Sequence, residues 1–250
     1  MKTSLRSIVV LCYMGVFLVL ALPYHLYLVM VGKKDEMRRF RKAAKTIRWA
    51  FGCELRNAGV KINVIGKENI PEDASLFVSN HRSYFDILVM QKTIPHPLGF
   101  IAKKEMESYP LLPFYMKDIG CLFLDRTNIK EGLKTILKGV NYLKQGLSLN
   151  ICPEGTRNQS PNLLPFKDGS LKIAEKAKCP VVPVALIGTE NLLENNPGFT
   201  IKKGIVTIAF GKPFYMSDLE GDAKKHPGAY VQSLVDSMRV KYADTIKSVM

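Results

Sequence analysis

The feature that most constrains the fold is an alternation, from Val60 onward, of short β-rich segments with segments of helical pattern. The β-rich segments favour strands because they are dominated by Val, Ile, Leu and Phe, and they cover residues 62–64, 76–78, 100–102, 121–124, 147–152, 181–187 and 205–210. Helical candidates lie between and after them at residues 84–92, 112–119, 129–145, 171–178 and 227–250. This alternation predicts an α/β domain with a largely parallel central sheet flanked by helices.

An uncharged apolar stretch, residues 8–32, precedes this region. It is long enough to cross a bilayer core of roughly 30 Å. Pro23 and His25 interrupt the stretch, so a kinked or partly inserted helix is as plausible as a straight span. A cleaved signal peptide is an alternative, although no convincing Ala-x-Ala site follows. A buried helix of a soluble core is the remaining interpretation.

A basic segment follows the apolar stretch directly. Its cations fall within two or three helical turns and are Lys33, Lys34, Arg38, Arg39, Arg41, Lys42, Lys45 and Arg48. Apolar residues recur there at spacings of three and four, so the segment is typical of an amphipathic helix on an anionic membrane surface, or of an ordinary surface helix. We expect residues 1–59 to form a membrane-associated N-terminal anchor. Residues 60–250 then form the α/β domain at the cell membrane, on the cytoplasmic side.

The composition favours anionic partners. The formal net charge is +14, from 36 Lys and Arg against 22 Asp and Glu. Such a balance suits nucleic acid, anionic lipid or a phosphorylated ligand, but no nucleic-acid motif or aromatic-basic stacking pattern is present, so we expect no nucleic acid partner. The 5 cysteines are scattered and the 4 histidines show no ligand spacing, so we expect neither a disulfide framework nor a bound metal.

A histidine and an aspartate, His81 and Asp86, follow the β-rich segment 76–78 at the start of a helical segment. A histidine exchanges protons near neutral pH, and a carboxylate on its far nitrogen fixes the tautomer. Residues five positions apart do not share a helix face, so this partnership requires a bend between them. The local alternative is that Asp86 and Ser83 form a capping box at the start of the helix.

A second group of polar residues follows other β-rich segments. Glu154, Gly155, Thr156 and Arg157 come after Cys152 and Pro153, and they suit a tight turn close to a phosphate. Lys104 and Arg126 follow two further segments and bring cations to the same edge of a parallel sheet. No Gly-rich nucleotide loop and no Gly-x-Ser-x-Gly elbow is present, which argues against a nucleotide cradle and a serine nucleophile.

Together these motifs resemble the bacterial 1-acylglycerol-3-phosphate acyltransferases (lysophosphatidic acid acyltransferases) of the glycerolipid acyltransferase family. Four blocks match in order: Asn80-His81 with Asp86; Lys104-Glu105-Met106 with Pro110, Gly120 and Arg126; Pro153-Glu154-Gly155-Thr156-Arg157 with Phe166-Lys167-Asp168-Gly169; and Val182-Pro183-Val184-Ala185 with Gly188-Thr189. The resemblance covers residues 60–213. Cys152 departs from the family, which usually has an aromatic residue there, and a packing role at the end of the strand is the better interpretation of this thiol.

The resemblance implies a chemistry. His81 would act as general base on the sn-2 hydroxyl of lysophosphatidate, supported by Asp86, and the product would be phosphatidate. The donor would be acyl-CoA or acyl carrier protein, used as a co-substrate with no further cofactor and no acyl-enzyme. Lys104, Arg126 and Arg157 would hold the phosphate, with Glu154, Gly155 and Thr156 shaping the same site.

Two other interpretations remain open. The same chemistry on another acceptor, such as glycerol 3-phosphate or another lysolipid, would use the same base and a similar set of cations. A basic membrane-binding module without enzymatic activity would depend on the charge of the chain and not on His81.

Overall fold

The structure is a computed structural model that describes residues 4–246. Its strands are β1 (Val60–Ile65), β2 (Leu76–Ser79), β3 (Leu98–Lys103), β4 (Leu122–Leu124), β5 (Ser148–Ile151), β6 (Val181–Ile187) and β7 (Gly204–Phe210). Its α-helices are α1 (Leu5–Leu20), α2 (Leu22–Gly32), α3 (Glu36–Asn57), α4 (Phe85–Thr93), α5 (Leu112–Asp118), α6 (Ile129–Lys144), α7 (Lys172–Ala177), α8 (Gly221–Lys225) and α9 (Pro227–Lys241). Each predicted β-rich segment contains or overlaps one of these strands.

The strands form one seven-stranded sheet in the order β1-β7-β6-β2-β5-β3-β4. Every neighbouring pair is parallel except β6 and β7, which are antiparallel. All seven residues of β6 are buried, as expected for a central strand that is covered by helices on both faces. The prediction of a largely parallel α/β sheet is therefore confirmed.

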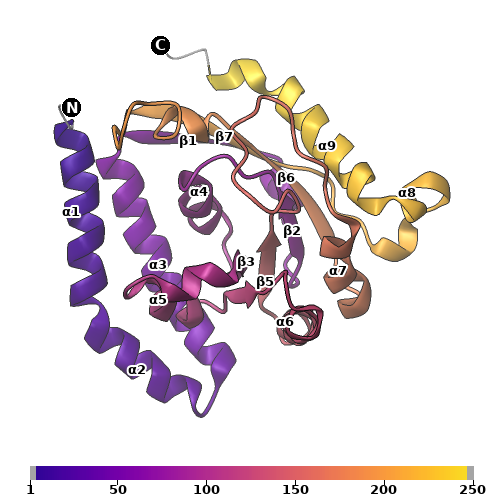
Figure 1. Ribbon diagram of the computed structural model, residues 1–250, viewed down its shortest axis with the longest axis horizontal. Coiled ribbons are helices and arrows are strands. Elements are labelled where there is room, and N and C mark those ends of the chain that lie inside the picture. Colours follow the sequence, from indigo (N-terminus) through magenta and orange to yellow (C-terminus); the bar gives the residue numbers. More distant parts are fainter. Residues whose placement is uncertain (1–3, 247–250) are drawn as a thin grey trace.

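Two hydrophobic cores lie on the two faces of the sheet, and successive residues of a strand alternate between them. Phe77 of β2 faces the core formed with α1 to α5, whereas Leu76 and Val78 face the core formed mainly with α6, α7 and α9. Figure 1 shows α1, α3, α4 and α5 on one side of the sheet and α6, α7 and α9 on the other. The α/β domain is thus a helix–sheet–helix sandwich.

The apolar stretch 8–32 is divided between α1 and α2, which are bent by 49° at the break. Pro23 lies in the first turn of α2, where its missing N–H costs no hydrogen bond. Among residues 4–246, no single helix has the length and hydropathy to cross a bilayer, and the bent pair α1–α2 meets that requirement only by length and composition. The kinked form of the predicted helix is the one that the structure contains.

Helix α3 buries its apolar face inside the protein. Phe40, Ala43 and Ile47 are buried, and α3 packs against α4 and α5 as well as against α1 and α2. Asp118 of α5 accepts hydrogen bonds from Arg39 and lies 2.8 Å from Nδ1 of His25, so it joins α2, α3 and α5. The exposed face of α3 therefore carries Arg38, Arg41 and Lys45 together with Trp49, which is 62% exposed.

The C-terminal helix is shorter than predicted. It ends at Lys241, a 3₁₀ turn (Ala243–Ile246) follows, and the predicted residues 247–250 lie outside the described part of the chain. The hydroxyl of Thr245 lies 2.8 Å from that of Thr207 in β7. This contact with the sheet competes with continuation of the helix and accounts for the difference.

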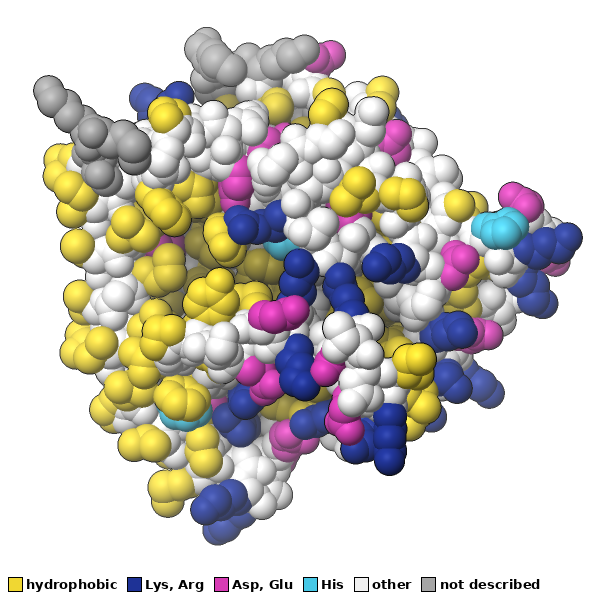
Figure 2. Space-filling view, in the orientation of Figure 1, with side chains coloured by type: hydrophobic (Ala, Val, Ile, Leu, Met, Phe, Trp, Pro, Cys, Tyr) yellow, Lys and Arg dark blue, Asp and Glu magenta, His cyan; other side chains and the backbone are white. Residues whose placement is uncertain are grey.

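Exposed apolar side chains gather on α1 and α2. The most exposed there are Leu5 (77%), Leu20 (73%), Met30 (69%) and Leu26 (63%). Figure 2 shows hydrophobic side chains along the edge formed by these helices, and a central hollow with hydrophobic side chains inside it and Lys and Arg side chains around it. The apolar edge is larger than the isolated surface leucines that are common on soluble proteins.

Candidate active site

The candidate base and its carboxylate partner meet at the carboxyl end of β2. Nδ1 of His81 lies 2.9 Å from Oδ2 of Asp86. The same oxygen accepts hydrogen bonds from the backbone N–H groups of Arg82 and Ser83, at 2.7 and 2.9 Å. These two bonds fold the chain back between His81 and Asp86, which supplies the bend that a five-residue separation requires. The Asp86 side chain is 2% exposed, while that of His81 is 20% exposed.

Asp86 also ends the loop in the manner of a helix cap. Ser83 donates its backbone N–H to Asp86, and the hydroxyl of Ser83 accepts from the backbone N–H of Phe85, at 3.0 Å, at the start of α4. This arrangement differs from a standard capping box, in which the serine would bind the N–H of Asp86 itself. One carboxylate therefore both closes the first turn of α4 and orients His81.

Glu154 links the loop after β5 to the loop that carries His81. Its Oε1 accepts from the backbone N–H of His81 at 2.9 Å, and its Oε2 accepts from Asn158 Nδ2 and from the backbone N–H of Leu164. The residue is 5% exposed. Glu154 therefore acts on the site by fixing backbone, because both of its oxygens are occupied by groups of the chain itself.

Three cations lie on the carboxyl edge of the sheet, each with a partner from the chain. Nζ of Lys104, after β3, lies 2.8 Å from Oδ2 of Asp125, and this contact raises the pKa of Lys104 and lowers that of Asp125. Nη1 of Arg126, after β4, donates to the carbonyl of Gly155 at 2.6 Å. Arg157, after β5, pairs with Glu194 at 3.3 Å. The sequence-predicted cations thus share one edge of the sheet.

Both the backbone conformation at position 155 and the lack of space around it require a glycine there. Its φ is +77°, a conformation that glycine adopts readily and other residues rarely adopt. A Cβ at this position would lie 2.3 Å from Nη1 of Arg126. Thr156, the next residue, is exposed. The turn therefore lets Arg126 approach the backbone of the loop after β5.

Cys152 is held in a polar contact at the end of β5. Its Sγ lies 3.4 Å from Oγ of Ser79 and 3.7 Å from Nδ2 of Asn150. Burial raises the pKa of this thiol to about 12, so it is protonated at neutral pH and is a poor nucleophile. The geometry agrees with the packing role expected from the sequence.

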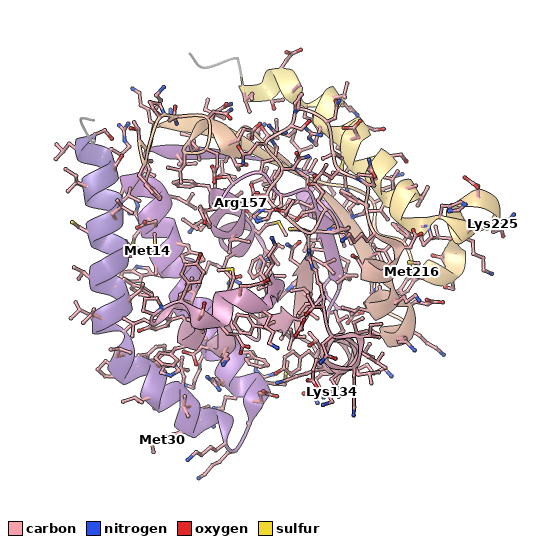
Figure 3. The ribbon with its side chains drawn as sticks, in the orientation of Figure 1. Met14, Met30, Lys134, Arg157, Met216 and Lys225 are labelled. Atoms are coloured by element: carbon pink, nitrogen blue, oxygen red, sulfur yellow. The ribbon has the colours of Figure 1, made fainter. Side chains whose placement is uncertain are left out.

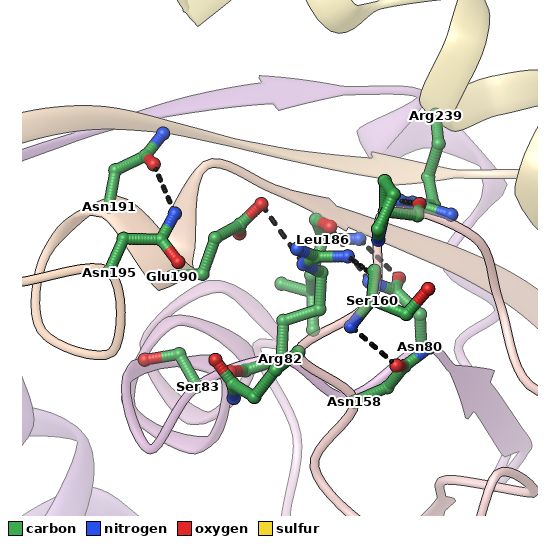
Figure 4. Close-up of polar contacts among 12 residues, drawn as sticks. Asn80, Arg82, Ser83, Asn158, Ser160, Leu186, Glu190, Asn191, Asn195 and Arg239 are labelled. Carbon is green, nitrogen blue, oxygen red and sulfur yellow. Dashed lines mark hydrogen bonds and ion pairs between the residues drawn. The ribbon is translucent and has the colours of Figure 1, made fainter.

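Sequence reasoning gave no structural role to several polar residues that hold the site together, although Asn80 belongs to the first matching block (Figure 4). Arg82 pairs with Glu190 at 3.0 Å and donates to the carbonyl of Ser160 at 2.5 Å. Arg239 of α9 donates to the carbonyl of Pro161 at 2.9 Å. Asn80 makes two hydrogen bonds with the backbone of Leu186 in β6. These partners are far apart in the sequence, so only the adjacency of Asn80 and Arg82 to His81 gave a local signal.

Among the described residues, no group of three or more His, Cys, Asp and Glu side chains is arranged to hold a metal ion. The polar groups at the carboxyl edge of the sheet are instead a proton acceptor, its carboxylate and three cations. This set can deprotonate a hydroxyl group and bind an anion next to it.

Comparisons with known proteins agree with this description. A protein of Saccharomyces cerevisiae named 1-acyl-sn-glycerol-3-phosphate acyltransferase is 31% identical over 194 residues, which are 76% of this chain and 61% of that protein. A protein of Mycoplasma pneumoniae named probable 1-acyl-sn-glycerol-3-phosphate acyltransferase is 37% identical over 163 residues, which are 63% of this chain and 59% of that protein. The chain thus spans about three fifths of the length of these relatives.

The crystal structure of the 1-acyl-sn-glycerophosphate acyltransferase of Thermotoga maritima has the same fold. Its TM-score is 0.76 over 98% of both chains, at 23% sequence identity. The model of the acyltransferase family matches residues 61–187, just over half of the chain and the region that holds β1 to β6 with the histidine, aspartate and cations described above. The chain therefore belongs to the acyltransferase family.

Proposed function

We propose that the protein transfers an acyl chain from acyl-CoA or acyl carrier protein to the sn-2 hydroxyl of lysophosphatidate and so makes phosphatidate. The observation that carries this proposal is the contact of His81 with the buried Asp86 on the sheet edge where Lys104, Arg126 and Arg157 also lie. The pair suits removal of a proton from a hydroxyl group, and the cations suit the phosphate of the same molecule. The names of the relatives support lysophosphatidate as the acceptor.

In the proposed reaction, Nε2 of His81 takes the proton of the acceptor hydroxyl while Asp86 holds the proton on Nδ1 and stabilises the imidazolium. The hydroxyl oxygen forms a bond to the carbonyl carbon of the thioester. The bond from that carbon to sulfur then breaks, and the thiolate recovers the proton from His81. No covalent enzyme intermediate and no further cofactor enters this scheme, and the protonated thiol of Cys152 takes no part in it.

Lys104, Arg126 and Arg157 bind the phosphate in this proposal. Each already has a partner in the chain, but a lysine has three donors and an arginine five, so donors remain for a ligand. Side chains of Lys104 and Arg157 are 54% and 34% exposed. Glu154 and Gly155 support the cations and the base through the backbone, and Thr156 is exposed beside them.

The proposal includes attachment to the cytoplasmic face of the cell membrane. The exposed apolar side chains of α1 and α2 suit insertion among acyl chains, and the basic face of α3 suits anionic headgroups. Figure 3 labels Met30 at the outer edge of α2. An acceptor with an acyl chain resides in the bilayer, so this attachment would place the site next to its substrate.

The activity is tested with the full chain purified in detergent. Lysophosphatidate and glycerol 3-phosphate are each combined with acyl-CoA and with acyl carrier protein, and the product is identified. We expect transfer to lysophosphatidate and a loss of about 10²–10⁴-fold in His81→Ala. Preference for glycerol 3-phosphate would reassign the acceptor, and near-normal turnover in His81→Ala would refute the mechanism.

The attachment is tested by sedimentation with vesicles that contain anionic phospholipid. Leu26→Glu with Met30→Glu should reduce binding in high salt, where only the apolar contribution remains unscreened. Val240→Glu is the matched control, because Val240 is 73% exposed but lies on α9. Wild-type protein released from vesicles by salt alone would contradict the apolar anchor.

A further inference from the structure

The guanidinium of Arg157 is enclosed by two residues from other parts of the chain. Its Cζ lies 3.6 Å from the centroid of the Tyr84 ring. Its Nη1 donates to Oε1 of Glu194 at 3.3 Å, and the same oxygen accepts from the backbone N–H of Tyr84 at 3.0 Å. Arg157, Tyr84 and Glu194 therefore contact one another in a closed set of three.

The three residues come from three segments that the fold brings together. Tyr84 lies between His81 and Asp86, in the loop that carries the base. Glu194 follows the 3₁₀ helix η4 (Thr189–Asn191) after β6, and Arg157 lies in the loop after β5. Figure 3 labels Arg157 at the centre of the face on which Figure 2 shows the hollow. The loop of the base thus also carries the ring under a phosphate-binding cation.

The arrangement leaves most of the guanidinium open. Arginine has five N–H donors in one plane, and within residues 4–246 the Arg157 side chain donates only the Nη1 bond to Glu194. The Arg157 side chain is 34% exposed, whereas that of Glu194 is 8% exposed. One side of the guanidinium is therefore fixed by a buried carboxylate and one face by a ring, while other donors remain available to an anion.

We propose that Tyr84 and Glu194 are positioning residues that hold Arg157 ready for the phosphate of the acceptor. The ring sets the plane of the guanidinium, and the carboxylate sets its rotation within that plane. This inference rests on the proposed function, because it takes the acceptor phosphate as the ligand of Arg157.

The proposed arrangement couples binding to catalysis through one short loop. Tyr84 is three residues from His81, so the loop fixes the distance from the base to the guanidinium. The distance from the hydroxyl to the phosphate is limited by a few covalent bonds in a glycerol phosphate. A site that holds both ends at a fixed separation places the hydroxyl at the base when the phosphate binds.

The test is steady-state kinetics of the full chain in detergent with Tyr84→Leu and its matched control Tyr84→Phe. Loss of the cation–π contact should raise the KM for lysophosphatidate about three- to thirtyfold. The KM for the thioester should change less than about twofold, since positioning of the phosphate does not alter donor binding, and any fall in kcat should be smaller than the rise in the acceptor KM. Tyr84→Phe should match the wild type because it keeps the ring, and among the described residues the Tyr84 hydroxyl has no hydrogen-bond partner.

A double mutant separates positioning of Arg157 from a general effect on the loop. In an Arg157→Ala background, Tyr84→Leu should not raise the acceptor KM further. Glu194→Ala should raise the acceptor KM, and Glu194→Gln should restore it, because the amide oxygen can still accept from Arg157 and Tyr84. Additive effects of Tyr84→Leu and Arg157→Ala, or a lower KM in Glu194→Ala, would overturn the proposal.

A binding measurement keeps this inference distinct from the proposed reaction. Thermal unfolding of the full chain is followed with increasing inorganic phosphate, which should stabilise the wild type and Tyr84→Phe more than Tyr84→Leu. Equal stabilisation of all three proteins would refute the positioning role. Absence of acyl transfer in the wild type with this difference in phosphate binding intact would refute the proposed function and leave the role of Tyr84 in place.

Discussion

Replacement of Asp86 by asparagine tests whether the site depends on the orientation of His81 or on the charge beside it. Oδ2 of Asp86 accepts from three N–H groups, those of His81 Nδ1, Arg82 and Ser83. An amide nitrogen in that place would face three donors, so the asparagine oxygen must occupy it. The substitution therefore keeps the proton on Nδ1 of His81 and removes only the negative charge.

The expected losses of kcat and of stability in Asp86→Asn follow from that geometry. A hydrogen bond to a charged group contributes about 1.5–3 kcal/mol, so loss of the charge should lower kcat about 10- to 150-fold. Oδ1 of Asp86 is buried without a hydrogen-bond partner among the described residues. The amide N–H₂ would also be unsatisfied there, so no new cost arises at this atom. The three hydrogen bonds to the other oxygen lose the contribution of the charge, which should lower the free energy of unfolding by about 1–3 kcal/mol.

The assay measures kcat with saturating lysophosphatidate and acyl-CoA, together with urea unfolding. Asp118→Asn is the control, because Asp118 is also buried and also contacts a histidine nitrogen, that of His25 at 2.8 Å, outside the site. It should lower stability and leave kcat within about twofold. A loss of about 10⁴ in Asp86→Asn would show that the tautomer had changed, and an unchanged kcat would show that the charge has no role.

Three further predictions follow from buried groups. Gly155→Ala should raise the KM for lysophosphatidate, because its Cβ would lie 2.3 Å from Nη1 of Arg126, and a fall in KM would contradict this geometry. Cys152→Ser should keep the kcat of the wild type. Alkylation of Cys152 at pH 8 should be slow, because burial raises the pKa of its thiol to about 12. A trapped acyl-cysteine at this position would overturn the direct transfer. Burial raises the pKa of Glu54 from 4.5 to about 7, so wild-type stability should fall as pH rises from about 4.5 to 7. Urea unfolding of Glu54→Met should lack this slope and give a gain of up to about 3 kcal/mol at pH 8.

The direction of the pH dependence of stability predicted for Glu54 follows from which state binds the proton. Between the unfolded and folded pKa values, the folded chain holds a proton that the unfolded chain has lost, so rising pH favours unfolding. Neither carboxylate oxygen of Glu54 has a hydrogen-bond partner among the described residues. Removal of the carboxyl group therefore removes the cost of a buried charge without breaking a hydrogen bond. A Glu54→Met variant with the same slope as the wild type would contradict this assignment.

The sequence by itself determined the α/β class and most of the strands and helices, because hydrophobic periodicity and turn residues are local signals. It also predicted the contact between His81 and Asp86, since the bend between them is made within the loop by the backbone of Arg82 and Ser83. The cations were located for a similar reason. Lys104, Arg126 and Arg157 lie one, two and six residues after the ends of β3, β4 and β5, and parallel strands end at one edge of the sheet.

Only the tertiary structure decided the partners of these residues. Glu194 is 37 positions from Arg157, Glu154 is 73 from His81, and Leu186 is 106 from Asn80. Such contacts depend on the order of the strands, with β2 between β6 and β5, and no local pattern encodes that order. The burial of the apolar face of α3 was decided in the same way. An amphipathic sequence specifies that one face is removed from water, and the neighbouring helices determine that protein, not lipid, covers it.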